Sequence, residues 1–219
     1  MSERTLSSLS LKRVFISLFI VALVPAIAKA LNIFVKQEDI SMMFALNQCG
    51  SLLIMYDWNL FGIHYNRSKA APQDFLIYFL LGMVLLGLWL WIGKSFLQSH
   101  VVLPKASSLI AYGYARPGMM IAFSFMEATV VNIGFKCLTD HLDVRTREIQ
   151  AILISGLLFG LVFTLLFTPW DLALWFRTYL YNLILISILS YLYNQSSSFM
   201  PGMLAMCVVY LGAMTISIL

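Results

Sequence analysis

The stretch FLIYFLLGMVLLGLWLWIGKSFL, residues 75–97, carries Lys94 as its single charge. A helix that crosses a bilayer needs about 20 mostly apolar residues, so this stretch predicts a membrane span. The composition of the whole chain agrees, because 61% of the 219 residues are hydrophobic and 11% are charged. A soluble domain carries about 25% charged residues and needs polar cover for its surface. The sequence therefore predicts an all-α integral membrane protein.

The same criterion finds further candidate spans on both sides of this stretch. They cover residues 14–34, 40–56, 117–138, 149–169, 172–193 and 201–219. The second of these is weaker than the others, because it contains Asn47 and Gln48. We expect a polytopic bundle of about seven transmembrane helices, in which residues 1–219 form a single domain in a bacterial plasma membrane.

The net charge of +4 does not indicate a nucleic-acid partner. Basic residues stand in ones and twos near span ends, as at Lys12–Arg13 and at Arg67 and Lys69. This is the distribution of membrane-flanking charge, and it favours an amino terminus on the inside. The expected partner is the lipid bilayer. Asp171 and Arg177, at the start of a span, are expected to form an interfacial ion pair.

The histidines and cysteines do not predict a metal site. All three histidines fall in predicted connections, where solvent or the membrane interface would surround them, and the three cysteines are widely separated, without a C-x-x-C pair. These residues are His64, His100, His141, Cys49, Cys137 and Cys207. A tetrahedral zinc site needs clustered nitrogen and sulfur ligands. We therefore expect no metal and no cofactor.

One carboxylate lies within an apolar run, SFMEATVVNIGF, residues 124–135. Glu127 falls near mid-depth of its predicted span, where a charged side chain costs about 2.5–3.5 kcal/mol on insertion scales. A carboxylate at this depth is a candidate functional residue. It can equally be a structural residue that hydrogen-bonds a neighbouring helix through Asn132 or Asn182. The sequence leaves both interpretations open.

Several stretches resemble the CAAX-protease and bacteriocin-processing (CPBP, or Abi) family of intramembrane proteins. DWNLFGIHYNRSKAAPQDFLIYFLLG resembles the amphipathic entry to the third span of that family, and FMEATVVNIGFKCL resembles its E-E-x-x-x-R helix. ISGLLFGLVFTLLF resembles the F-x-x-x-H helix, and SSSFMPGMLAMCVVYLGAM resembles the last helix, with H-x-x-x-N. The resemblance covers about residues 55–219 and implies a CPBP-like core there.

The motif residues themselves depart from the family pattern. The paired glutamates fall on Met126 and Glu127, so one carboxylate is present. The arginine falls on Val131, or on Asn132 if the helix is shifted by one residue. In the family these groups converge and activate a water, which requires a base and usually a second polar group or metal. The resemblance thus implies that Glu127 is either the catalytic base or the remnant of one.

The remaining motif positions have lost their polar groups. Phe159 matches the aromatic residue of the second motif, but Phe163 stands at its histidine. Met206 stands at the histidine of the last motif and Tyr210 at its Asn or Asp. The resemblance implies a binding site formed by Glu127, Asn132, Phe159, Phe163, Met206 and Tyr210.

Three functions are compatible with these residues. We expect a non-catalytic CPBP-like protein that binds a membrane protein or peptide partner, in a bacteriocin-immunity-like or regulatory role. The first alternative is an active intramembrane CAAX-type endopeptidase that uses Glu127. The second is the substrate-binding membrane component of a small-molecule transporter. A histidine or second carboxylate within reach of Glu127 would favour the peptidase, and a closed pocket lined by Trp and Asn would favour the transporter.

Overall fold

All secondary structure in the described part of this computed structural model is helical, as predicted. The structure describes residues 58–98, 116–143, 147–168 and 171–216, and the single residues Lys12, Phe15, Ile16, Phe19 and Leu23. The predicted spans 14–34 and 40–56 lie outside the described residues, apart from four of those single residues. The expected number of about seven spans therefore stays a prediction.

The helices follow the predicted spans closely. The chain forms α3 (Trp58–Ala70), α4 (Pro72–Ile92) with a π-helical end η2 (Gly93–Leu97), α6 (Arg116–Asp143), α7 (Glu148–Phe167), α8 (Leu172–Ser196) and α9 (Met200–Ile216). Each of the five predicted spans from residue 75 onward falls on one of these helices. Pro72 begins α4, because a proline has no N–H to donate and fits the first turn of a helix.

Among the described residues, three helices are long and apolar enough to cross a membrane: Pro72–Leu97, Glu148–Leu165 and Leu172–Ser196. Met200–Ala213 is apolar but shorter. In α4, Gly82, Leu86 and Leu90 are buried against the bundle, whereas Val84 and Leu88 are more than half exposed. A helix that is apolar on its outer face as well as its inner face is typical of a membrane span. These features identify a membrane protein.

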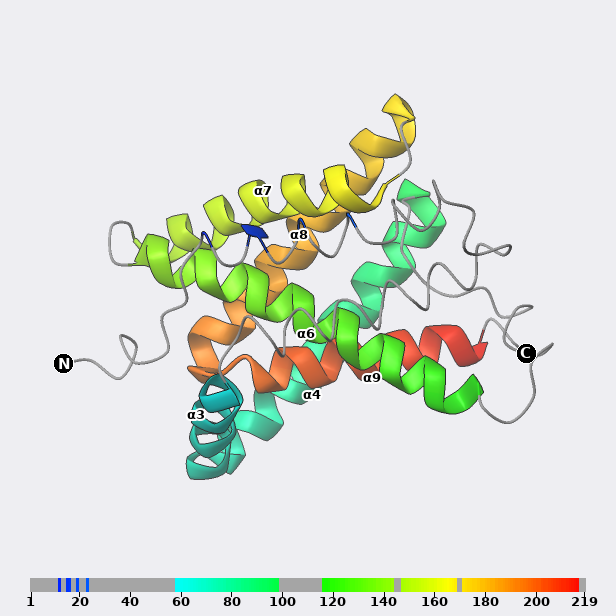
Figure 1. The fold of residues 1–219 in the computed structure, drawn as a ribbon. Helices are drawn as coiled ribbons and strands as arrows, with labels where there is room; N and C mark the ends of the chain where they lie inside the picture. The colour runs from blue at the N-terminus through cyan, green and yellow to red at the C-terminus, as the bar shows by residue number, and fades with distance from the viewer. Residues whose placement is uncertain are drawn as a thin grey trace.

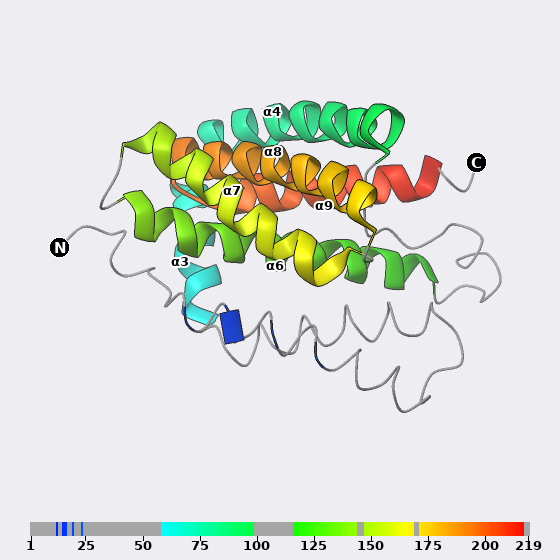
Figure 2. The same ribbon diagram turned by 90° about the horizontal axis from the view of Figure 1, so that it is seen from above.

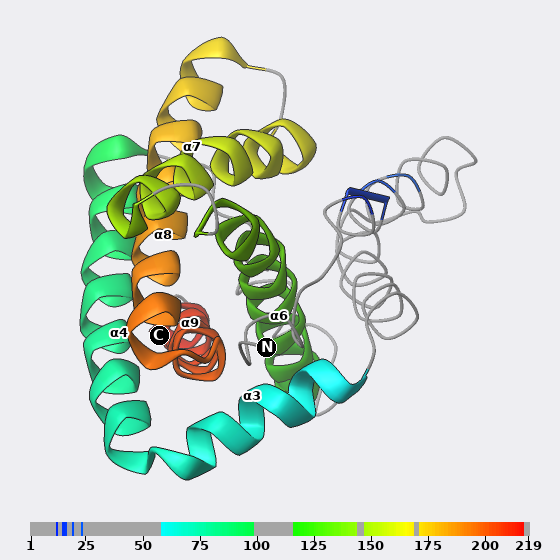
Figure 3. The ribbon, with the colours of Figure 1, turned by 90° about the vertical axis from the view of Figure 1, so that its left-hand side faces the viewer.

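Helices α8 and α9 lie between α4 on one side and α6 on the other (Figures 1 and 3). Helix α9 packs on both α4 and α6, and α7 packs mainly on α8. Figure 2 shows α4, α8 and α6 as successive layers, and Figure 3 shows α3 crossing one end of the bundle. Helices α6 and α9 run in opposite directions (Figure 1). The core is therefore built around α8, α9 and one face of α6.

Two glycines allow the close packing of α7 on α8. A side-chain carbon at Gly156 would stand 2.7 Å from the Leu183 carbonyl oxygen, and one at Gly160 would stand 2.9 Å from the Leu183 nitrogen. Gly156 and Gly160 form a G-x-x-x-G pattern, which brings helix backbones together in membranes. The pattern is readable from the sequence and explains why these two helices are neighbours in space as well as in sequence.

The expected ion pair between Asp171 and Arg177 does not form. Asp171 instead caps the start of α8, where its carboxylate accepts hydrogen bonds from the amides of Ala173 and Leu174. Arg177 donates a hydrogen bond to the side-chain oxygen of Gln98, at the end of η2. Amides in the first turn of a helix have no intrahelical acceptor, so a carboxylate at the N-cap satisfies them.

Candidate functional site

Glu127 is buried in the bundle, with 4% of its surface exposed. It lies on the same face of α6 as Val131, which is fully buried, whereas Phe125 is exposed. Its carboxyl group is close enough to the hydroxyls of Tyr181 on α8 and Tyr210 on α9 to interact with both electrostatically. The site around Glu127 is thus formed by α6, α8 and α9, with two phenols as its polar neighbours.

Asn132 lies on α6 beside the start of α9. Its amide nitrogen donates to the Ala128 carbonyl oxygen at 2.7 Å and contacts the Met206 sulfur at 3.8 Å. Its amide oxygen is buried without a hydrogen-bond partner and faces Gly202, where a side-chain carbon would stand 3.2 Å away. Buried polar atoms are nearly always paired, so this oxygen is an exception among the described side chains.

Tyr181 supplies a second buried polar atom without a partner. Its hydroxyl interacts with the Tyr210 hydroxyl, and among the described residues it has no hydrogen bond of standard geometry. Its ring stacks on Trp89, with centroids 6.0 Å apart, and the Trp89 indole donates to the Tyr181 carbonyl oxygen at 3.0 Å. Trp89 therefore fixes the Tyr181 ring from the α4 side and leaves its hydroxyl directed into the bundle.

Phe159 and Phe163, two of the predicted site residues, lie together on α7. Their rings stack with centroids 6.2 Å apart, and both side chains are buried. The Phe159 ring lies on Gly134, where any side-chain carbon would overlap it. Gly134 is two helical turns from Glu127, or about 10 Å along the axis. The structure thus links Glu127 to Tyr210 and Asn132 to Met206, and it places the Phe159 ring on α6 at Gly134.

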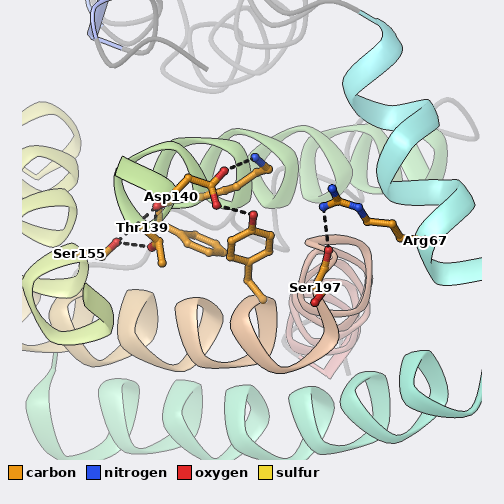
Figure 4. Close-up of polar contacts among 8 residues, drawn as sticks. Arg67, Thr139, Asp140, Ser155 and Ser197 are labelled. Atoms are coloured by element: carbon orange, nitrogen blue, oxygen red, sulfur yellow. Dashed lines mark hydrogen bonds and ion pairs between the residues drawn. The ribbon is translucent and has the colours of Figure 1, made fainter. Parts of the chain in front are cut away.

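A polar cluster that the sequence did not predict lies near the end of α6. Lys136 is fully buried, and its ammonium is 2.6 Å from the Asp140 carboxylate (Figure 4). The Tyr193 hydroxyl donates to the other oxygen of Asp140 at 2.5 Å, and the Lys136 ammonium lies 5.6 Å from the centre of the Tyr193 ring. The carboxylate neutralises the buried cation, and the phenol satisfies its second oxygen.

Hydroxyl groups join three helices beside this cluster. The Thr139 hydroxyl donates to Ser155 at 2.9 Å and lies 3.3 Å from the Ser190 hydroxyl (Figure 4 draws the first of these contacts). The Phe135 carbonyl oxygen, 2.9 Å from the Thr139 hydroxyl, is an alternative acceptor for its single proton. All three hydroxyls are fully buried. They hold α6, α7 and α8 together with hydrogen bonds that need no charge.

His64 was expected to lie in a connection surrounded by solvent or by the membrane interface, and this prediction was wrong. It lies within α3 and is fully buried, with its ring 4.4 Å from that of Phe199 and 6.0 Å from that of Tyr193. Neither ring nitrogen has a hydrogen-bond partner. Burial, with the positive charges of Lys136 and Arg67, lowers the pKa of His64 from 6.5 to about 3. The ring is therefore neutral in the folded protein at neutral pH.

The sequence did contain a signal for the Lys136 cluster. Lys136 and Asp140 are four residues apart, the spacing at which opposite charges pair on a helix. Lys136 also lies near the end of the predicted span 117–138, where a charge that flanks the membrane is common. Among the described residues, no three His, Cys, Asp or Glu side chains gather as metal ligands. Cys137 and Cys207 are both buried.

Searches of protein-family models, curated proteins and solved structures found no match to the chain.

Proposed function

We propose that the chain is a CPBP-like integral membrane protein of a bacterial plasma membrane that binds a membrane protein or peptide partner without cleaving it. The role would be bacteriocin-immunity-like or regulatory. The observation that carries this proposal is that two buried polar atoms of the candidate site, the Asn132 amide oxygen and the Tyr181 hydroxyl, lack a hydrogen-bond partner among the described residues. Such atoms cost about 1–3 kcal/mol each when unpaired, and a bound polar group would recover that energy.

The side chains around Glu127 support binding over hydrolysis. A peptidase needs a base together with a group that holds water and polarises the carbonyl. Among the residues that the structure describes, the ionisable groups that interact with Glu127 are the phenols of Tyr181 and Tyr210. Met206 occupies the position of a family histidine and gives the neighbouring Asn132 amide a thioether contact, which is a weak acceptor. A phenol and an amide suit recognition of a polar group on a partner.

The substitutions Glu127→Gln and Glu127→Leu test the proposal. Glutamine keeps the shape and hydrogen-bonding capacity of glutamate but cannot act as a base, whereas leucine removes both properties. Each variant is expressed at equal membrane levels in a native host lacking the protein, and the phenotype and cleaved membrane peptides are scored. Glu148→Gln, at an exposed glutamate on α7, is the matched control.

We expect Glu127→Gln to retain function and Glu127→Leu to lose it, with no cleaved peptide in any strain. Loss of function in Glu127→Gln with normal expression would overturn the proposal. The same loss together with loss of a cleavage product would establish the peptidase, because removing a general base costs a factor of about 10² to 10⁴ in rate.

A further inference from the structure

Helix α3 packs on α4, which follows it in the chain, and it also contacts the turn Ser197–Phe199 between α8 and α9. The Arg67 guanidinium donates to the Ser197 carbonyl oxygen at 3.2 Å (Figure 4). The Ser68 hydroxyl donates to the Ser198 hydroxyl at 3.0 Å, and Ser198 donates in turn to the carbonyl oxygen of His64 at 3.1 Å. These contacts tie the second half of α3 to the start of α9.

His64 is the buried side chain at the centre of this attachment. Its ring packs against Phe199, and Phe61 packs against the same ring with centroids 5.6 Å apart. Both nitrogens of the imidazole lack hydrogen-bond partners. A protonated ring would have two N–H donors and a positive charge, and nothing among these contacts accepts them.

The charged groups around His64 also oppose its protonation. Arg67 lies one turn away on α3, and Lys136 approaches from α6; both act on the ring with positive charge. From α8, the Tyr193 hydroxyl is already donated to Asp140, whose other oxygen pairs with Lys136. The nearby carboxylate is therefore committed to Lys136 and Tyr193 and does not compensate a charge on His64.

We propose that α3 is a proton-sensitive clamp, formed by His64, Arg67 and Ser68 on the turn Ser197–Phe199, and that protonation of His64 releases it. This inference is independent of the proposed function. Release would expose the turn that begins α9, the helix that carries Met206 and Tyr210. A fall in pH would thereby change the surroundings of α9, one of the helices that surround Glu127.

The direction of the effect follows from proton linkage. In the clamped state the pKa of His64 is lowered from 6.5 to about 3, and in a released α3 it returns to its ordinary value. Between these two values the released state binds more protons, so falling pH favours release. The opening equilibrium should rise by a factor of about 30 between pH 7.5 and pH 5.0, since each pH unit below 6.5 contributes roughly tenfold.

Hydrogen exchange measures this opening directly. The full chain in lipid nanodiscs is exchanged at pH 7.5, 6.0 and 5.0, and protection factors are corrected for intrinsic exchange rates. We expect the protection of α3 amides to fall about 30-fold between pH 7.5 and pH 5.0 while α8 amides keep theirs. Equal α3 protection at both pH values in the wild type would overturn the proposal.

Three variants assign the effect to His64. In His64→Phe and His64→Leu, which retain an apolar side chain without a titratable group, the pH dependence should disappear. His141→Phe replaces an exposed histidine at the end of α6 and should leave the wild-type fall intact. Persistence of the fall in either His64 variant that folds, or its loss in His141→Phe, would overturn the assignment.

Discussion

Helix α6 carries two buried ionisable side chains, the acidic Glu127 and the basic Lys136, in different surroundings. Lys136 has a carboxylate at 2.6 Å, and that carboxylate is also bonded by a phenol. Glu127 has two phenols nearby, and one of them, Tyr181, leaves its hydroxyl without a partner. A complete polar network stabilises a fold, whereas an incomplete one can accept a ligand. The comparison separates a structural cluster from a candidate binding site on one helix.

The largest effect is expected for Asp140→Ala. The substitution leaves the buried Lys136 ammonium without its carboxylate, so the free energy of unfolding should fall by about 3–5 kcal/mol. Unfolding of the purified protein by SDS in mixed micelles measures the change. The double variant Lys136→Met/Asp140→Ala removes the stranded charge and should recover part of the loss. A loss below about 1 kcal/mol in Asp140→Ala would show that the Lys136–Asp140 ion pair contributes little to the stability of the fold.

A smaller loss is expected for Ser155→Ala. The Ser155 hydroxyl accepts from Thr139 and also from Ser190 at 3.4 Å, so its removal breaks one hydrogen bond between α7 and α6 and one between α7 and α8. The free energy of unfolding should fall by about 1 kcal/mol, as for a typical buried hydrogen bond. The same SDS titration checks it, and Ser187→Ala, a serine that bonds its own helix, is the control. Equal losses of unfolding free energy in the two variants would show that hydroxyl bonds between helices stabilise the fold no more than a hydroxyl bond within one helix.

Glu127→Gln should change the free energy of unfolding by less than about 1 kcal/mol, in contrast to Asp140→Ala. Glutamine has nearly the same volume as glutamate, and no cation is paired with Glu127 in the contacts described. The measurement is again SDS unfolding, run beside Asp140→Ala. A loss of unfolding free energy close to that of Asp140→Ala would show that Glu127 also stabilises the fold. The two sites would then not differ in the way proposed.

The smallest effect is expected for metal removal. Protein purified without chelator should contain no stoichiometric zinc by elemental analysis, and EDTA should leave the unfolding transition unchanged. The residues that could have bound zinc are dispersed in the sequence, and a zinc site needs three or four clustered ligands. Stoichiometric metal would identify a ligand set that the dispersed cysteines and histidines did not predict.

The sequence predicted the helices better than it predicted their polar contacts. Spans from residue 75 onward were identified because apolar length is a local property, readable residue by residue. Burial of His64 depends on Phe199, 135 positions later in the chain, and no local pattern encodes that contact. The Lys136–Asp140 pair was readable from its spacing, but the burial that gives it importance arises only when α8 brings Tyr193 against it.

The candidate site was only partly predictable for the same reason. The family resemblance directed attention to Glu127 and Asn132, and both are buried. It could not indicate Tyr181, because that residue comes from a helix on which no motif lies. Nor could it show that Phe159 contacts α6 at Gly134, since helix rotation and tilt are set by packing. The roles assigned to the six predicted site residues stay predictions.

The most direct test of the contrast compares two tyrosines of α8 by the same substitution. Tyr193→Phe removes a hydroxyl that is bonded to Asp140, and Tyr181→Phe removes one that has no partner. Unfolding free energy and the host phenotype are measured for both variants. We predict that Tyr193→Phe lowers the unfolding free energy by about 1.5–3 kcal/mol. Tyr181→Phe should leave the unfolding free energy unchanged and reduce the protein's function in the host. Equal stability losses in the two variants, or full function of Tyr181→Phe in the host, would contradict the account.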